Sequence, residues 1–531
     1  MVYGAARAAW GVGICAWLLG GCLGALKVEG GTGGGDGGAG GQAGSGGQGG
    51  AAGQGGDEPA CGVELCHTPE TESCDMYVCP SVGWSVRVGD ASDQDARAIA
   101  AKSSSGADRI YVAGRFRGAL AVGDTQIVSE GESDDAFVAA IDGDGKGAWV
   151  RSVGGSDQGG VGLGDVPRLA FGVAVDTTDQ VVVGGAYRTT TPGSGLDDHD
   201  GFVRAWPSGA TTAAWTRTFG GAGYDRAVAV TTAANAVFVL GTIGAAEGTS
   251  TPVPISCNGE TIHPVPAGET HMLLVRYSAQ GACQWALVLE GGVHEPTALA
   301  ATLGGDVFVA GAYGGALLGA GPDVPATGGK AGFVMKVGSA GFVTWLRTFG
   351  GGPAGDMAHP RALALTPGSV RVTGSLGGSI DFGAGPIEAS KESPFVLALD
   401  EGVGNTLWST RIGGEESPAA FARGVGITTL LDGSTLVAGT FFPSFDVDPN
   451  VSGDEIEGYA QSAFLARFDE LGVLQTFDAW GDGESPAERP ISLTSANEAV
   501  YVATGWSNRL GFEAPNVTPA GQDLVVARFN P

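Results

Sequence analysis

Short apolar runs separated by turn-forming residues fill the chain from about residue 81 onward. In the stretch that begins at Trp215 the runs read "TRTF", "AVAV", "AVFVLG" and "MLLVRYS", and Gly, Asn, Asp or Pro residues bound them. Runs of this length that are rich in Val and Phe, between such boundaries, are typical of β-strands. The pattern therefore predicts an all-β fold.

The set of four runs repeats along the chain. Aligned on a tryptophan, the repeats start at Trp84, Trp149, Trp215, Trp285, Trp345 and Trp408, and a seventh unit without the tryptophan follows near Thr476. A unit of four short strands cannot bury both of its faces alone, so neighbouring units must stack. Stacking around an axis predicts a seven-bladed β-propeller over residues 81–531.

The phase of the repeat predicts how such a ring closes. The run "AFVAAID" and its counterparts precede each tryptophan, and the last of them, "LVVARFN", ends the chain. The chain thus begins in mid-unit at Trp84 and ends with the strand that belongs before it. We expect residues 524–529 to pair with residues 84–88, which removes two sheet edges that a linear solenoid would leave exposed.

These repeats resemble a known family. The segment "DAFVAAIDGDGKGAWVRSVGG" at residues 135–155 is similar to the SBBP-type β-propeller repeat, and the similarity covers about residues 81–531. The third unit carries an insertion and the last lacks the tryptophan. The resemblance implies a propeller in an exported protein or lipoprotein of Gram-negative bacteria, and it implies no particular activity.

Composition and net charge exclude some classes of protein and of partner. The chain has 96 glycines and only 16% charged residues, which argues against an ordinary helical or α/β enzyme. Its net charge of −29 excludes nucleic acid as a direct partner, because nucleic acid requires a basic surface.

The N-terminal segment predicts export and lipid anchoring. Residues 1–21 read as a signal peptide, and Leu19-Gly20-Gly21-Cys22 resembles a bacterial lipobox in which Cys22 carries the lipid that binds the membrane. Leu23 replaces the aspartate that is typical of inner-membrane retention, so we expect the outer membrane. Residues 22–60 form a Gly-rich flexible tether. The alternative is an uncleaved membrane helix over residues 8–26.

The cysteines predict disulfides. Residues 61–80 form a small Cys-rich segment in which two bridges are expected among four cysteines: Cys61, Cys66, Cys74 and Cys79. A zinc knuckle is the alternative, but its ligand spacing fits poorly. The remaining candidates, Cys257 and Cys283, form a third pair in an exported protein.

An acid and an arginine recur after the Gly-Gly turn of most units. The acids are Asp95, Asp225, Glu295, Asp356, Glu416 and Glu488, and the arginines are Arg97, Arg226, Arg361, Arg423 and Arg489. We expect these pairs to clamp the blade junctions, with a cation-concentrating acidic rim as the alternative. The recurring Trp and Phe residues are expected in the core.

Departures from the repeat supply the candidate sites. In "DVDPNVSGDEIE" the residues Asp446, Asp448, Asn450, Asp454 and Glu457 stand where an EF-hand places calcium ligands. Against calcium, Val451 and Pro449 do not suit that loop, so an ordinary acidic loop is the alternative. The histidines in the irregular loops, His199, His263 and His294, are expected to be solvated, and no other cofactor is expected.

The function predicted from the sequence is binding. No HExxH, P-loop or nucleophile elbow stands outside the low-complexity segment. We expect a monomeric, lipid-anchored scaffold of the cell envelope that presents a rigid propeller to a protein or glycan. The alternative is an envelope hydrolase or lyase with its site in the propeller funnel.

Overall fold

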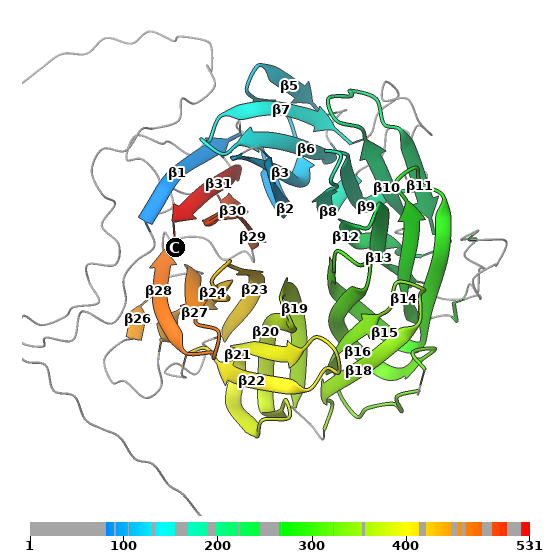
Figure 1. The fold of residues 1–531 in the computed structure, drawn as a ribbon, viewed down its shortest axis with the longest axis vertical. Coiled ribbons are helices and arrows are strands. Elements are labelled where there is room, and N and C mark those ends of the chain that lie inside the picture. The colour runs from blue at the N-terminus through cyan, green and yellow to red at the C-terminus, as the bar shows by residue number, and fades with distance from the viewer. Residues whose placement is uncertain are drawn as a thin grey trace, which may run out of the picture. The chain divides into compact units, whose positions relative to one another are not determined.

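The computed structural model describes residues 81–530 with gaps at 90–91, 105, 130–132, 154–167, 190–197, 221–222, 245–256, 258–264, 267, 322, 353–355, 414–420, 448–454, 458–461, 481–490 and 507–521. These residues fall within one compact unit of the chain. Every regular element that the structure describes is a β-strand, and the sheets stand around a central axis (Figure 1).

Five of the described sheets have four antiparallel strands each. In order they contain β2 (Gln94–Ser104), β3 (Ala107–Phe116), β6 (Asp135–Asp142) and β7 (Gly147–Ser152); β8 (Arg168–Val175), β9 (Val181–Arg188), β10 (His199–Trp206) and β11 (Trp215–Phe219); β19 (Met357–Thr366), β20 (Ser369–Asp381), β21 (Pro386–Asp400) and β22 (Thr406–Arg411); β23 (Phe421–Thr429), β24 (Thr435–Phe442), β27 (Ser462–Phe468) and β28 (Leu474–Trp480); and β29 (Ile491–Ala496), β30 (Ala499–Trp506), β31 (Asp523–Asn530) and β1 (Ser81–Val88). Two small hairpins pair β4 (Ala119–Val122) with β5 (Thr125–Val128) and β25 (Ser444–Asp446) with β26 (Glu455–Glu457).

One larger sheet has seven strands. They are β12 (Arg226–Ala233), β13 (Ala236–Gly244), β14 (Thr270–Ser278), β15 (Cys283–Ala301), β16 (Val307–Leu318), β17 (Ala331–Val337) and β18 (Val343–Gly350). The two halves of β15 have different neighbours, because residues 283–289 pair with β14 and residues 293–301 pair with β16. Gly291, with a φ of 100°, stands between the halves. The strand is therefore the last of one group of four strands and the first of the next.

The two ends of the described chain meet in one sheet. Strand β1 pairs antiparallel with β31, with Ser85 opposite Ala527 and Val88 opposite Leu524. This is the pairing that the phase of the repeat predicts.

The first strands of neighbouring groups contact one another around the axis. These contacts join β2 to β8, β8 to β12, β12 to β15, β15 to β19, β19 to β23, β23 to β29 and β29 to β2. Apolar side chains fill the spaces between sheets: in β13, for example, every residue is buried. The core is thus divided among the sheet interfaces, which is why the inner runs of each repeat are apolar on both faces.

A β-bulge recurs in the first strand of six groups, opposite a glycine of the second strand. The bulged residues are Arg97, Phe171, Val228, Thr297, Arg361 and Val425. A Cβ atom on Gly114 would lie 1.8 Å from the carbonyl oxygen of Asp95, and one on Gly374 would lie 2.0 Å from that of His359. Only glycine allows the second strand to approach the bulge this closely.

At five junctions between groups, the recurring tryptophan of one group contacts a turn of the next. Trp215 on β11 donates its indole Nε1–H to the carbonyl oxygen of Ala279 at 2.9 Å, in the turn between β14 and β15. Its ring covers Gly281 of the same turn, which has a φ of 79° and whose Cβ would lie 2.6 Å from the ring. We name this contact the tryptophan–glycine clasp. It recurs for Trp84 with Gly143 and Gly145, Trp285 with Ser339 and Gly341, Trp345 with Glu401 and Gly404, and Trp408 with Glu470 and Gly472.

Burial of the tryptophans follows the expectation in part. Trp84, Trp215 and Trp345 are buried, as are Phe219 and Phe349. The other repeat tryptophans, Trp149, Trp285 and Trp408, keep an intermediate exposure.

The clasp predicts a difference between two glycines of one sheet. Both Gly404→Ala and Gly368→Ala force a non-glycine residue to a φ near 75°, at 71° and 77°, which costs about 1–2 kcal/mol each. Only at Gly404 would the new Cβ meet an indole ring, that of Trp345 at 2.7 Å, whereas nothing lies within 4 Å at Gly368. Chemical denaturation should show Gly404→Ala to be less stable than Gly368→Ala by about 1–3 kcal/mol. Equal losses would mean that the ring does not press on the turn.

Candidate functional site

The bulges change which residues of the first strands are equivalent. Pairing places Arg97 and Arg361 at the bulge itself, whereas Arg226 and Arg423 stand two residues earlier, at the position of Asp95. The expectation that these arginines recur at one equivalent position is therefore wrong, because the number of residues between the Gly-Gly turn and the bulge differs between the groups. The earlier position is occupied by Asp95, Arg226, Glu295, His359 and Arg423, so charged residues of both signs begin the first strands.

The first strand of the first group, β2, contains the expected pair of an acid and an arginine. The buried Asp95 lies 3.4 Å from Nε of Arg97 and 3.5 Å from Nε of Arg115. Arg115 also contacts Asp134, with Nη1 and Oδ2 2.7 Å apart, and Arg117 contacts the same carboxylate at 2.9 Å. The predicted pair of Asp95 and Arg97 is therefore present, inside a larger network.

A second cluster bridges two sheets through an acid that the repeat motif does not contain. Glu392 on β21 lies 2.6 Å from Nη2 of Arg423 on β23 and 3.6 Å from Nη2 of Arg361 on β19. Burial raises the pKa of Glu392, but hydrogen bonds from Arg423 and Ser375 and the charges of both arginines outweigh it and hold that pKa below its ordinary value. The expected partner Asp356 instead accepts a hydrogen bond from the Ser379 amide at 3.0 Å. Glu416, Glu488 and Arg489 lie outside the described residues.

A half-buried histidine lies beside this cluster. His359 approaches Glu295, with Nε2 and Oε2 3.7 Å apart, and Glu295 forms a 2.5 Å ion pair with Lys330. Burial, together with the charges of Arg361, Lys330 and Arg423, lowers the pKa of His359 to about 3. His359 is therefore neutral at pH 7.

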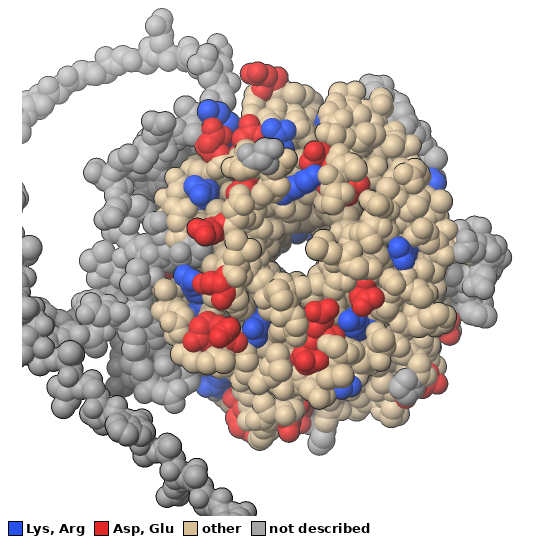
Figure 2. All heavy atoms as spheres, viewed as in Figure 1, with Lys and Arg blue, Asp and Glu red and all other residues tan. Residues whose placement is uncertain are grey.

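The chemistry of these groups favours structure over catalysis. The carboxylates of Asp95, Glu295 and Glu392 are each engaged by basic side chains, and a histidine with a pKa far below 7 is a weak general base. Figure 2 shows a central opening with acidic and basic side chains interspersed around it on this face. No group of metal-binding side chains is found within the described ranges.

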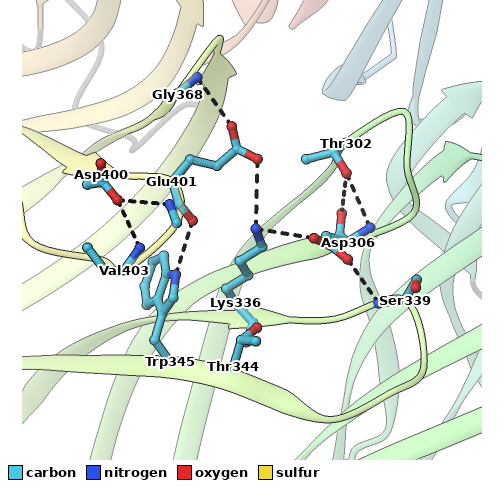
Figure 3. Close-up of polar contacts among 11 residues, drawn as sticks. Thr302, Asp306, Lys336, Ser339, Thr344, Trp345, Gly368, Asp400, Glu401 and Val403 are labelled. Atoms are coloured by element: carbon cyan, nitrogen blue, oxygen red, sulfur yellow. Dashed lines mark hydrogen bonds and ion pairs between the residues drawn. The ribbon is translucent and has the colours of Figure 1, made fainter.

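A separate polar network ties the turns between strands together (Figure 3). Nζ of Lys336 lies 3.2 Å from Asp306 and 3.8 Å from Glu401, which belong to turns of two adjacent groups. Asp306 accepts a hydrogen bond from the Ser339 amide at 3.0 Å, and Glu401 accepts one from the Gly368 amide at 3.2 Å. The backbone carbonyl of Glu401 also receives the indole of Trp345. This network holds the turn backbones in place around a clasp.

The disulfide and lipid predictions have different outcomes. Cys257 and Cys283 form the predicted disulfide. Cys22 and the cysteines at 61, 66, 74 and 79 lie outside the described residues. In the part of the chain that is described, no helix combines the length and the apolar character needed to cross a membrane.

The calcium candidates are divided between strands and undescribed residues. Asp446 ends β25 and pairs across the hairpin with Glu455, while Glu457 in β26 pairs with Ser444. Asp448, Asn450 and Asp454 lie outside the described residues. Strands therefore flank the loop, in contrast to the helices of an EF-hand, and calcium binding there stays a prediction.

The histidines differ from their expectation. His294 is buried, and its two ring nitrogens each lie 3.0 Å from a carbonyl oxygen, of Leu289 and of Ala316. The expectation of a solvated loop residue is wrong for His294 because β15 carries it between the two groups that it joins. His199 packs on Tyr224 with ring centroids 4.7 Å apart, and His263 lies outside the described residues.

Together, the radial sheets, the contacts between successive first strands and the core divided among sheet interfaces define a β-propeller. No protein-family model matches the sequence, and no curated protein matches it. Membership of the SBBP-type family therefore stays a prediction.

Solved structures similar to this chain are themselves of varied function. The WD40 β-propeller domain of Doa1 has 12% identity and a TM-score of 0.40, over 84% of this chain and 96% of that domain. A quinohemoprotein alcohol dehydrogenase from Comamonas testosteroni has 12% identity and a TM-score of 0.38, over 85% and 76%. The GH93 α-L-arabinofuranosidase of Fusarium graminearum has 10% identity and a TM-score of 0.34, over 67% and 91%. At these scores the similarities carry no argument about function.

His359 predicts a pH dependence of stability. Its pKa is about 3 in the folded state and about 6.5 in an unfolded chain, so between these values the unfolded state binds a proton that the folded state does not. Stability from this residue is complete above pH 6.5 and falls as the pH drops toward 3.

We expect His359→Gln to lose less stability than the wild type between about pH 7 and pH 4. Denaturation curves collected across this range measure it. Between about pH 7.5 and pH 9 the difference between the two proteins should be constant because His359 is neutral in both states. Parallel pH profiles throughout would contradict the burial of an uncharged imidazole.

Proposed function

We propose that this protein is a lipid-anchored, non-enzymatic scaffold of the cell envelope, in which a closed seven-bladed propeller is presented on a Gly-rich tether to a protein or glycan. Export and attachment follow from residues 1–21 and from Cys22, and the absence of aspartate at position 23 favours the outer membrane. The propeller itself acts as a monomer.

The strand pairings support seven blades. Five sheets have four strands, and the seven-stranded sheet divides at β15 into two more groups of four that share this strand. The pairing of β1 with β31 and the contact of β29 with β2 support closure of the ring.

One observation carries the choice of binding over catalysis. Charged side chains near the start of the first strands form ion pairs with neighbouring side chains. Arg361 and Arg423, for example, both pair with Glu392 on β21. Such pairs stabilise a scaffold, and they hold the pKa of Glu392 below its ordinary value. An envelope hydrolase or lyase would need ionisable groups that converge on a substrate, and the approach of His359 to Glu295 at 3.7 Å is the nearest feature to this among the groups described above. The pKa of His359, lowered to about 3, argues against a role as general base.

Closure of the ring is tested by deletion. Removing residues 520–531 takes away β31 and exposes edges on both β1 and β30, so the melting temperature should fall by well over 10 °C or the protein should fail to fold. Removing the same number of residues from the tether, 35–46, should leave the melting temperature unchanged. Equal melting of the two deletion proteins would contradict closure by this strand.

Anchoring is tested at the lipobox cysteine. Cys22→Ala removes the thiol that would carry the lipid, and fractionation of cells should move the protein from the membrane to the soluble fraction. Cys15→Ala, seven residues earlier in the apolar stretch, is the matched control and should leave the protein in the membrane. A Cys22→Ala protein that stays in the membrane would favour a spanning helix over residues 8–26.

A further inference from the structure

Large apolar side chains stand exposed on a set of turns. Leu303 is 92% exposed, Leu431 82% and Phe342 78%, and Val403, Leu471 and Val473 are also exposed. We name these six residues the apolar turn surface. Each lies in a turn between the first and second or the third and fourth strand of its group.

Polar contacts join these turns into one surface. Asp306 connects the turn of Leu303 to Ser339, in the turn of Phe342, and Lys336 connects both to Glu401, beside Val403 (Figure 3). Further along, Arg371 donates to the carbonyl oxygen of Glu470, next to Leu471. Arg467 then pairs with Asp432, next to Leu431, at 2.7 Å. Three successive groups therefore present their turns at the same end of their sheets.

The counterpart turns of the other groups differ. Among the described residues they are occupied by glycine, alanine, proline and polar side chains, at positions 143–146, 207–214, 234–235, 279–282 and 497–498. The clasp does not need an apolar residue at the tip of a turn, because Gly341 and Gly472 supply its contact. In the described turns of this kind, exposed large apolar residues are found in these three groups, so the scaffold does not require them. Exposed apolar patches often mark interaction surfaces.

Around the apolar turn surface, the acidic side chains are more exposed than most of the basic ones. Acidic side chains stand beside the apolar tips: Asp432 is 54% exposed, and Glu401 and Asp306 are about one-third exposed. The basic side chains are mostly less exposed, since Lys336 is 12% exposed, Arg371 is buried and Arg467 is 25% exposed. Arg347 reaches the surface, where it donates to the carbonyl oxygen of Val403 at 2.6 Å. A partner therefore meets apolar side chains whose border has more exposed carboxylates than exposed cations.

We propose that the apolar turn surface binds a partner protein whose contact region presents apolar side chains bordered by lysine and arginine. Charge complementarity favours this occupant because each acidic border residue then faces a cation. A second copy of this chain would place acid against acid, and an anionic lipid surface would be repelled in the same way. The proposal rests on the scaffold role and adds the surface and the chemistry of its partner.

The test uses the purified full-length chain and two synthetic peptides, one alternating leucine with lysine and the other alternating leucine with glutamate. The wild type should bind the lysine peptide and not the glutamate peptide in fluorescence anisotropy. Leu303→Ser, Phe342→Ser and Leu471→Ser together should weaken that binding at least about tenfold. Asp432→Lys should weaken it by reversing one border charge. Val128→Ser, at a 66% exposed residue of β5 outside the surface, is the matched control and should bind as the wild type does.

Several results would overturn the proposal. They are binding of both peptides alike, binding of neither, or full affinity in the triple variant with an unchanged melting temperature. Loss of self-association in the triple variant during sedimentation would assign the surface to a second copy. Loss of adhesion to phosphatidylcholine vesicles would assign it to lipid.

Capture from envelope extracts separates this proposal from the scaffold role. Equal retention of the same proteins by wild type and triple variant would refute the surface and leave the scaffold role standing. Retention of nothing by the wild type would refute the scaffold role itself.

Discussion

The tryptophan–glycine clasp is the contact on which the ring depends. An indole on the outer strand of one group covers a turn of the next group and donates a hydrogen bond to its backbone, as Trp345 does to Glu401. The glycine beneath the ring has a left-handed φ and no room for a side chain, as at Gly404. The geometry of each turn is thus tied to the packing of the neighbouring sheet. Because the contact recurs at five junctions, a shift of a group at any of these junctions disturbs the next group.

The opposite ends of the first strands are joined differently. There charged side chains stand at or two residues before several of the bulges, and ion pairs such as that of Glu392 with Arg423 connect adjacent sheets. Partly buried pairs of this kind are weak sources of net stability, but they specify which arginine meets which acid. The clasps and the ion pairs together make a rigid body, and a rigid body loses little conformational entropy when it binds a partner.

Much of the architecture was predictable because it repeats. Strand positions, the role of Trp84 as a repeat marker and the pairing of the last strand with the first follow from apolar runs that recur in phase. The ion pairs were less predictable. The loop that precedes each first strand varies in length, so the sequence did not show that Arg97 stands at a bulge and Arg226 two residues before one, and Glu392 lies outside the repeated motif. His359 was not predicted because two of the charges that lower its pKa, those of Lys330 and Arg423, lie far from it in the sequence. The exposure of Leu303 and Phe342 likewise depends on where each turn points.

Cooperation among the clasps is the central claim, and exchange of the indole hydrogens measures it most directly. The Nε1–H groups of Trp84, Trp215, Trp285, Trp345 and Trp408 can be followed by NMR in the native protein under increasing denaturant. If the clasps hold one closed ring, these hydrogens exchange with a common free energy equal to that of global unfolding. Separate and lower free energies, with one group opening independently of its neighbours, would contradict the account.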